Sequence, residues 1–131
     1  MKIAVGIGCD RDTPLVSVRC ALHEALEKCQ AELADVAAIA SIDLKADEGA
    51  LLQLAEQEGW TIRFYPASAL AEVPVPSPSE VVRRHTGTPS VAEAAALLVA
   101  GVEQSELLLE KHRYRGADGR NVTLSIARMP E

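Results

Sequence analysis

Aromatic side chains are scarce in this chain of 131 residues, where Phe, Trp and Tyr together make up 3 %. Few rings are therefore available to stack on nucleotide bases. Acidic residues outnumber basic ones by 19 to 13, and the resulting net charge of −6 repels phosphate backbones. Both shortages argue against a nucleic acid as the partner.

Cysteines and long apolar runs are also few. The three cysteines are odd in number and show no C-x-x-C spacing, which argues against a disulfide framework and is typical of a reducing compartment. The longest apolar run, residues 94–102, has about half the length that a membrane-spanning helix needs. Residues 1–9 are faintly signal-like, but Asp10 and Arg11 follow at once, so we expect a buried first strand. We predict a cytoplasmic protein with no membrane association.

The apolar residues that are present, 48 % of the chain, are enough for one ordinary core. We find no internal repeat, low-complexity tract or linker. Residues 1–131 are therefore expected to form a single domain, which needs neither a disulfide nor a structural metal to fold.

The periodicity of the apolar residues predicts alternating strands and helices. Residues 15–33 carry an apolar stripe at helical spacing, and Gly59 stands where a helix would end. Prolines at 74, 76 and 78 require an extended connection. Strands are predicted at residues 3–7, 36–42, 61–65, 107–114 and 122–129, and helices at 15–33, 51–58, 79–85 and 91–100.

This order predicts a three-layer α/β/α fold with a five-stranded, mostly parallel sheet. Glycines within residues 115–120 mark a hairpin, which makes the last strand antiparallel. We place that C-terminal strand at an edge, in the order 3-2-1-4-5.

The first strand ends in a glycine pattern that invites a dinucleotide interpretation. Gly6 and Gly8 match the fingerprint, and Asp43 ends the second strand where a ribose-binding acid would lie. Arg11 stands where the third glycine is required, so we expect no nucleotide cofactor. In the simpler interpretation, Gly6 and Gly8 only allow a tight exit from the strand.

Three hydroxyl–proline pairs, Thr13-Pro14, Ser77-Pro78 and Thr88-Pro89, lie at the heads of predicted helices. Ser77 with Glu80, and Ser90 with Glu93, have capping-box spacing, so plain helix capping explains each pair by itself. If the three helix starts share one sheet edge, however, their free N–H groups would form a site for anions such as carboxylates.

Other polar side chains give less specific indications of a binding or catalytic role. Lys45 could pair with a ligand carboxylate and Asp43 could accept a ligand N–H, or residues 41–48 are a solvated loop in which Asp47 caps the next helix. Cys20 and His23 could share a helix face, but two ligands are too few for a metal site, so none is expected. Cys9 could be a nucleophile, although the sequence places no His beside it.

Four blocks occur in an order that resembles one known family: residues 6–9 (GIGC), 40–48 (ASIDLKADE), 78–82 (PSEVV) and 87–96 (GTPSVAEAAA). They are similar to the CobE family, which is also the C-terminal domain of the cobalt-precorrin-5A hydrolase CbiG. One departure is visible, because the family usually has basic residues and then glycine after the first cysteine. This chain has Asp10, Arg11 and Asp12 there.

The resemblance implies a role in cobalamin biosynthesis, with a corrin-ring precursor as the ligand and other enzymes of the pathway as partners. Such precursors are flat macrocycles with carboxylate arms, which the helix starts, Lys45 and Arg11 would suit. The fused hydrolase is associated with opening a lactone on the ring, so hydrolysis is the alternative to binding or transfer. If this chain catalyses such a hydrolysis, the candidate catalytic residues are Asp43, Glu93 and Cys9. The expected ligand-binding residues are Gly8, Cys9, Arg11, Thr13, Asp43, Lys45, Ser79, Glu80, Thr88 and Ser90.

Overall fold

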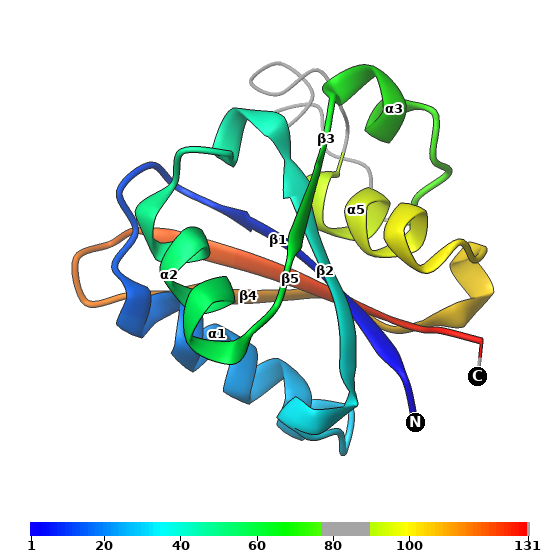
Figure 1. Ribbon diagram of the computed structural model, residues 1–131, viewed down its shortest axis with the longest axis horizontal. Helices are drawn as coiled ribbons and strands as arrows, with labels where there is room; N and C mark the ends of the chain where they lie inside the picture. The colour runs from blue at the N-terminus through cyan, green and yellow to red at the C-terminus, as the bar shows by residue number, and fades with distance from the viewer. Residues whose placement is uncertain (77–89, 131) are drawn as a thin grey trace.

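The structure is a computed structural model that describes residues 1–76 and 90–130. The predicted helix at 79–85 and the pairs Ser77-Pro78 and Thr88-Pro89 therefore lie outside the described residues. The fold is a mixed α/β domain with one five-stranded sheet (Figure 1). Its strands are β1 (Ile3–Cys9), β2 (Val36–Ile42), β3 (Ile62–Tyr65), β4 (Leu107–Arg115) and β5 (Asn121–Arg128).

The strand order is β3-β2-β1-β5-β4, so the prediction of a C-terminal edge strand was wrong. β5 is antiparallel, as predicted, but it pairs with β1 along the whole length of that strand, and β4 forms the edge. The reason lies in the side chains. Val122, Leu124 and Ile126 of β5 are fully buried, whereas most residues of β4 are exposed or only partly buried, and three of its four exposed residues are charged. Charged side chains are typical of edge strands because they discourage further pairing.

The helices are α1 (Leu15–Lys28), α2 (Gly49–Glu58), α3 (Ala67–Ala71) and α5 (Val91–Ala100). α5 has the predicted bounds, and α2 ends at Gly59, whose φ of 74° is left-handed, as its C-cap position suggested. The predicted helix 15–33 is too long. Gln30 has a φ of 54° that cannot continue a helix, yet Leu33 still packs against the core, which explains why the apolar stripe extended that far. The short helix α3 was not predicted.

Helices α1 and α2 lie on one side of the sheet and α5 on the other (Figure 1), and alternate residues of β1 pack against these two sets of helices. Ile3, Val5 and Ile7 belong to the core formed with α1 and α2, and Ala4 packs against α5. Small side chains at this second contact let the backbones of α5 and β1 approach closely, so the first turn of α5 is held beside the end of β1. Within the described part of the chain, no helix is long and apolar enough to cross a membrane.

Candidate functional site

A cavity of about 710 Å³ opens at the carboxyl ends of β1 and β2, beside the first turn of α5. This is the edge at which open α/β sheets bind ligands. Gly8, Thr123 and Arg113 are register neighbours across β1, β5 and β4 and form part of its wall. The remaining lining comes from the loop after β1, the loop after β2, and α5, through Cys9, Asp10, Arg11, Ile42, Leu44, Lys45, Ser90, Val91, Ala92, Lys111 and Asn121.

The lining is basic although the protein is acidic. Four cationic side chains reach the cavity from three separate parts of the chain, and Asp10 is the one acidic residue among the described lining residues. Clustered positive charge in a concave site attracts anions and raises their local concentration. The cations are Arg11, Lys45, Lys111 and Arg113.

Arg11 is held by the loop after β2. One guanidinium nitrogen lies 2.8 Å from Asp47 Oδ1 and 3.1 Å from Glu48 Oε2, and the other donates to the carbonyl of Leu44 at 2.9 Å. The bond and the charge of Arg11 hold the pKa of Asp47 below its usual value. Arg11 thus joins the two loops that border the cavity. The N-cap of α2 is Glu48, so the alternative in which Asp47 caps that helix was wrong.

Asp12 occupies the position at which the family pattern has glycine, and it keeps a glycine-like backbone. Its φ is 63°, in the left-handed region that non-glycine residues seldom adopt. The backbone N–H of Asp12 donates to Oε1 of Glu48 at 2.8 Å, and the Glu48 side chain is 3 % exposed. The loop therefore has a left-handed residue, Asp12, at the position of the missing glycine. The buried carboxylate of Glu48 holds the backbone of Asp12 in place.

Asp10 and Thr13 hold the other side of this loop. The carboxylate of Asp10 accepts the backbone N–H of Asn121 at 2.7 Å, which ties the loop to β5. The Thr13 hydroxyl donates to the carbonyl of Asp10 at 2.6 Å and is buried outside the cavity lining. Pro14, not Thr13, is the N-cap of α1, and no side chain caps it, so the capping interpretation of Thr13 was wrong.

Cys9 lines the cavity, and its thiol is less acidic than an ordinary cysteine thiol. Burial raises the pKa of its thiol from 9.0 to about 11, and the nearby charge of Lys45 offsets only part of this effect. A thiol with this pKa is almost entirely protonated at neutral pH, and the thiolate is the nucleophilic form. The surroundings of Cys9 therefore favour a role in lining the cavity over a role as a nucleophile.

Ser90 is the N-cap of α5 by position, but the capping box predicted with Glu93 does not form. Ser90 is 1 % exposed and lines the cavity, and Glu93 is fully buried one turn later. The Ser90 hydroxyl and both carboxylate oxygens of Glu93 have no hydrogen-bond partner within the described residues. Buried polar groups without partners are rare and often mark a functional position.

The structure thus brings five of the predicted ligand-binding residues to one cavity: Gly8, Cys9, Arg11, Lys45 and Ser90. Asp43 is exposed at the start of a 3-10 turn (Asp43–Lys45) and is not part of the lining. The predicted site residues Ser79, Glu80 and Thr88 lie outside the described residues.

Sequence reasoning missed the part of the site on β4 and β5: Lys111, Arg113, Asn121 and Thr123. Alternation in β4 was a usable signal, because Lys111 and Arg113 flank His112, which points to the other face and bonds Glu24 of α1 at 2.8 Å. The alternation in β4 points to this cavity only once β5 is known to lie between β1 and β4, because that strand order places Lys111 and Arg113 near the end of β1.

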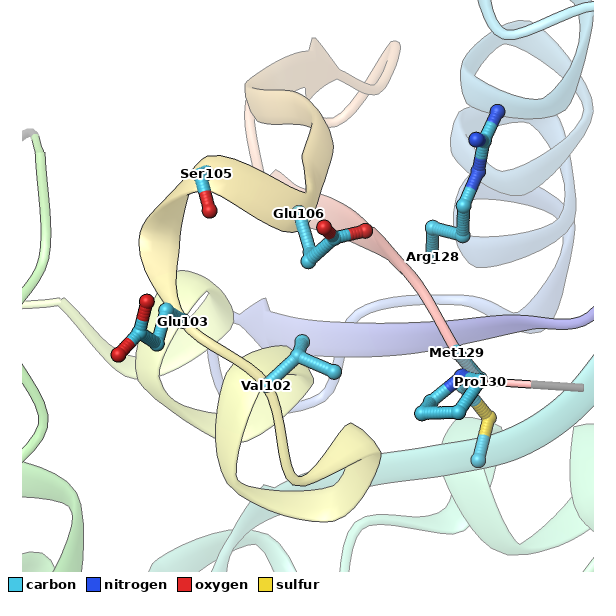
Figure 2. A pocket seen from close by; sticks show the side chains of 7 residues that line it. All are labelled: Val102, Glu103, Ser105, Glu106, Arg128, Met129 and Pro130. Atoms are coloured by element: carbon cyan, nitrogen blue, oxygen red, sulfur yellow. The ribbon is translucent and has the colours of Figure 1, made fainter.

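A second cavity, of about 530 Å³, lies at the other end of β5 (Figure 2). Glu103 and Glu106 come from the segment after α5, while Arg128, Met129 and Pro130 come from the C-terminal end. It contains none of the predicted site residues. Among residues 1–76 and 90–130, no three His, Cys, Asp or Glu side chains gather closely enough to hold a metal ion.

Fold and site together define a mixed α/β fold with a cation-lined cavity at the ends of its strands. The chain matches the family described as "Cobalamin synthesis G C-terminus" over residues 3–127, and it belongs to that family of cobalamin biosynthesis proteins.

Two curated relatives contain the matched region within longer chains. A cobalt-precorrin-5A hydrolase of Priestia megaterium is 33 % identical over 98 % of this chain, but the match covers 32 % of the hydrolase. Protein CobE of Sinorhizobium sp is 37 % identical over 83 % of this chain and 71 % of its own length. The chain therefore spans about a third of that hydrolase and most of that CobE.

Solved structures show the same fold. The crystal structure of CobE, a protein from the cobalamin biosynthetic pathway, superposes with a TM-score of 0.80 at 35 % identity, covering 95 % of this chain and 93 % of that one. The cobalamin biosynthesis protein chiG from Agrobacterium tumefaciens has a TM-score of 0.67 at 27 % identity, covering 98 % and 99 %.

Proposed function

We propose that this chain binds a corrin-ring precursor in the cavity at the ends of β1 and β2 and assists its conversion or transfer. The observation that carries the proposal is the gathering of four cationic side chains around one cavity in a protein of net charge −6. We also infer that residues 1–131 act as a single domain, since the family match spans nearly all of them.

The chemistry of the lining matches the chemistry of this ligand class. Corrin precursors combine a flat apolar ring with carboxylate arms. Ile42, Leu44 and Val91 supply apolar surface within the cavity, and Leu44 is 51 % exposed. Lys45 and Arg113 supply cations that can form charge-assisted hydrogen bonds to the arms. The apolar surface would support the ring and the cations would fix its orientation.

Arg11 has a different role in this proposal from that of Lys45 and Arg113. Its guanidinium already binds Asp47, Glu48 and the carbonyl of Leu44. We assign it chiefly to holding the two loops together, with one edge at the cavity. Ser79, Glu80 and Thr88 remain predicted ligand contacts.

Hydrolysis of a lactone on the ring has no specific support among the described residues. Cys9 has a raised pKa, and Asp43 is exposed away from the cavity lining. A hydrolase needs a base within reach of its nucleophile or water. We therefore place binding before catalysis, and hydrolysis is an outcome that the experiments can reveal.

The test is a titration of the purified protein with cobyrinic acid, a corrin polycarboxylic acid, followed by its visible spectrum. Lys45→Ala and Arg113→Ala should each weaken binding by about tenfold or more, since one charged hydrogen bond contributes about 1.5–3 kcal/mol. Lys28→Ala is the matched control, because Lys28 is exposed on α1 away from the cavity. The proposal fails if the visible spectrum of cobyrinic acid does not change in the presence of about tens of micromolar wild-type protein. Even weak specific binding would be detected at that concentration.

Incubation with a lactone-bearing precorrin addresses the alternative. Opening of the lactone, seen as a change in product mass, with release of a two-carbon fragment as acetaldehyde, would show that the protein is a hydrolase and not only a binding protein. Turnover that is lost in Glu93→Gln while binding remains would then assign the catalytic carboxylate.

A further inference from the structure

Helix α5 begins at the cavity without a side-chain cap. The N–H groups in the first turn of a helix have no partner within the helix, and a capping side chain usually accepts one of them. Ser90 holds the N-cap position of α5 but makes no capping bond. Val91 and Ala92, the next two residues, line the cavity together with Ser90. The uncapped end of α5 thus forms part of the cavity wall.

The hydroxyl of Ser90 is a buried donor without a partner. Ser90 is 1 % exposed, and its Oγ has no hydrogen-bond partner within the described residues. Buried hydroxyls are nearly always hydrogen-bonded, because an unbonded one destabilises the folded state. Ser41 is equally buried, and its hydroxyl donates to the carbonyl of Ile7 at 2.6 Å. Since Ser90 lines the cavity, a ligand can supply the acceptor that the described protein does not.

The packing of α5 on the sheet holds its first turn beside polar residues of the strands. A Cβ atom on Gly8 would lie 3.7 Å from the Cβ of Val91, so this turn lies against the end of β1. Thr123 and Arg113 follow Gly8 in register across β5 and β4. The start of α5 and Arg113 therefore line one cavity from opposite sides of Gly8 and Thr123, and a ligand with several arms can contact both.

The charges around this turn favour an anion. The positive end of the helix dipole lies at the start of α5 and adds to the four cations of the lining. Asp10 is the acid among the described lining residues, and its carboxylate already accepts the N–H of Asn121 at 2.7 Å. Glu93, the acid of the first turn, is fully buried and is not a lining residue. A carboxylate in the cavity therefore meets an excess of positive charge in the lining.

We propose that the start of α5 is a carboxylate subsite, in which the Ser90 hydroxyl and the backbone N–H groups of Val91 and Ala92 donate hydrogen bonds to one carboxylate arm of the ligand. The identity of that ligand rests on the proposed function. The subsite gives the arms different partners, because cations bind some of them and the uncharged donors of α5 bind one. A carboxylate accepts such bonds more strongly than a neutral amide does, so the subsite distinguishes a free acid arm from an amidated one.

The first experiment tests the subsite without a corrin. Sodium propionate, which has the chemistry of a single arm, is titrated into ¹⁵N-labelled protein up to about 100 mM, because one carboxylate binds far more weakly than a many-armed ligand. The amide proton resonances of Val91 and Ala92 should move downfield, and the movement should be much smaller in Ser90→Ala. Propionamide is the control, since it has the same shape without the charge and should move them little. Sodium chloride keeps the ionic strength equal in all samples.

The second experiment compares two buried serines. Ser90→Ala should weaken cobyrinic acid binding by about tenfold or more, since it removes a hydrogen bond to a charged group. It should leave the midpoint of urea unfolding unchanged or higher, because the hydroxyl has no partner in the protein alone. Ser41→Ala is the matched control and should show the opposite pattern. It should lower the midpoint, because Ser41 bonds Ile7, and keep the affinity, because Ser41 is not a lining residue.

The two experiments separate the possible failures. If the wild-type protein binds no cobyrinic acid while propionate moves the Val91 and Ala92 resonances in a Ser90-dependent way, the proposed function fails and the subsite stands. If cobyrinic acid binds, but Ser90→Ala keeps its affinity and propionate moves neither resonance, the subsite is overturned. A clear loss of stability in Ser90→Ala would identify the hydroxyl as a structural cap and would also overturn it.

Discussion

A Cβ atom on Gly6 would lie 1.9 Å from the backbone carbonyl oxygen of Ala92 and 2.7 Å from the backbone nitrogen of Ala96. No side chain fits at such distances, so the backbone of α5 rests directly on β1 at this point. The contact fixes the height of α5 above the sheet and, with it, the position of Ser90 at the cavity. Gly6 is therefore a packing glycine within the strand, and the interpretation of it as a strand exit was wrong.

Replacement of Gly6 tests this contact. Gly6→Ala should destabilise the protein by about 3 kcal/mol or more, since overpacking against backbone atoms cannot be relieved by a change of rotamer. Urea unfolding measures the free energy. Gly8→Ala is the matched control on the same strand, because its nearest neighbours are side-chain atoms of Val91 at 3.7 Å. Equal stabilities of the two variants would contradict the close packing of α5 on β1.

The left-handed backbone of Asp12 leads to a second prediction. Asp12→Gly should be more stable than Asp12→Ala by about 1 kcal/mol, because glycine adopts a φ of 63° without steric strain. Both variants keep the backbone N–H that binds Glu48. Thermal unfolding of the pair gives the difference, and an alanine variant as stable as the glycine variant would show that the loop has no such strain.

The contact of Arg11 with two acids of different burial leads to a third prediction. Arg11→Ala should destabilise the protein clearly, because it leaves the buried Glu48 carboxylate without its counter-charge. Asp47→Asn should change stability much less than Arg11→Ala does, since Asp47 is 81 % exposed and surface ion pairs contribute little. Chemical denaturation measures both, and the reverse ranking would show that the surface pair is the important one.

The raised pKa of Cys9 predicts slow alkylation at neutral pH. Iodoacetamide should modify Cys9 slowly at pH 8, and the rate should rise steeply toward pH 11, where the thiolate forms. Peptide mapping by mass spectrometry separates Cys9 from Cys20 and Cys29, which are also free thiols. Fast modification of Cys9 at pH 7 would contradict the raised pKa and return this residue to the candidate nucleophiles.

The same shift predicts how stability depends on pH. The folded state holds the Cys9 proton more tightly than the unfolded state does, so the contribution is fully present below pH 9.0 and is lost as pH rises through about 11. Wild-type protein should therefore lose more stability than Cys9→Ala across this window. Parallel loss in both proteins would show that the thiol is not the group responsible.

The elements of the fold were largely predictable from the sequence because helices and strands reflect the spacing of neighbouring residues. β2 and α5 have the predicted bounds, and Gly59 ends α2 as expected. The antiparallel direction of β5 followed from its hairpin with β4, which is also a local feature. Its place beside β1 did not, because that pairing joins residues more than a hundred positions apart.

The candidate site likewise has a part that the sequence predicts and a part that it does not. By itself the sequence determined the family, the alternation of strands and helices, and the residues at the ends of β1 and β2, because short motifs and local periodicity encode them. The tertiary structure alone decided that β5 lies inside the sheet, that Lys111 and Arg113 reach the same cavity as Lys45, and that Arg11 binds Asp47. Those relationships depend on how buried surfaces fit together over long stretches of chain, and no local pattern of residues records that fit.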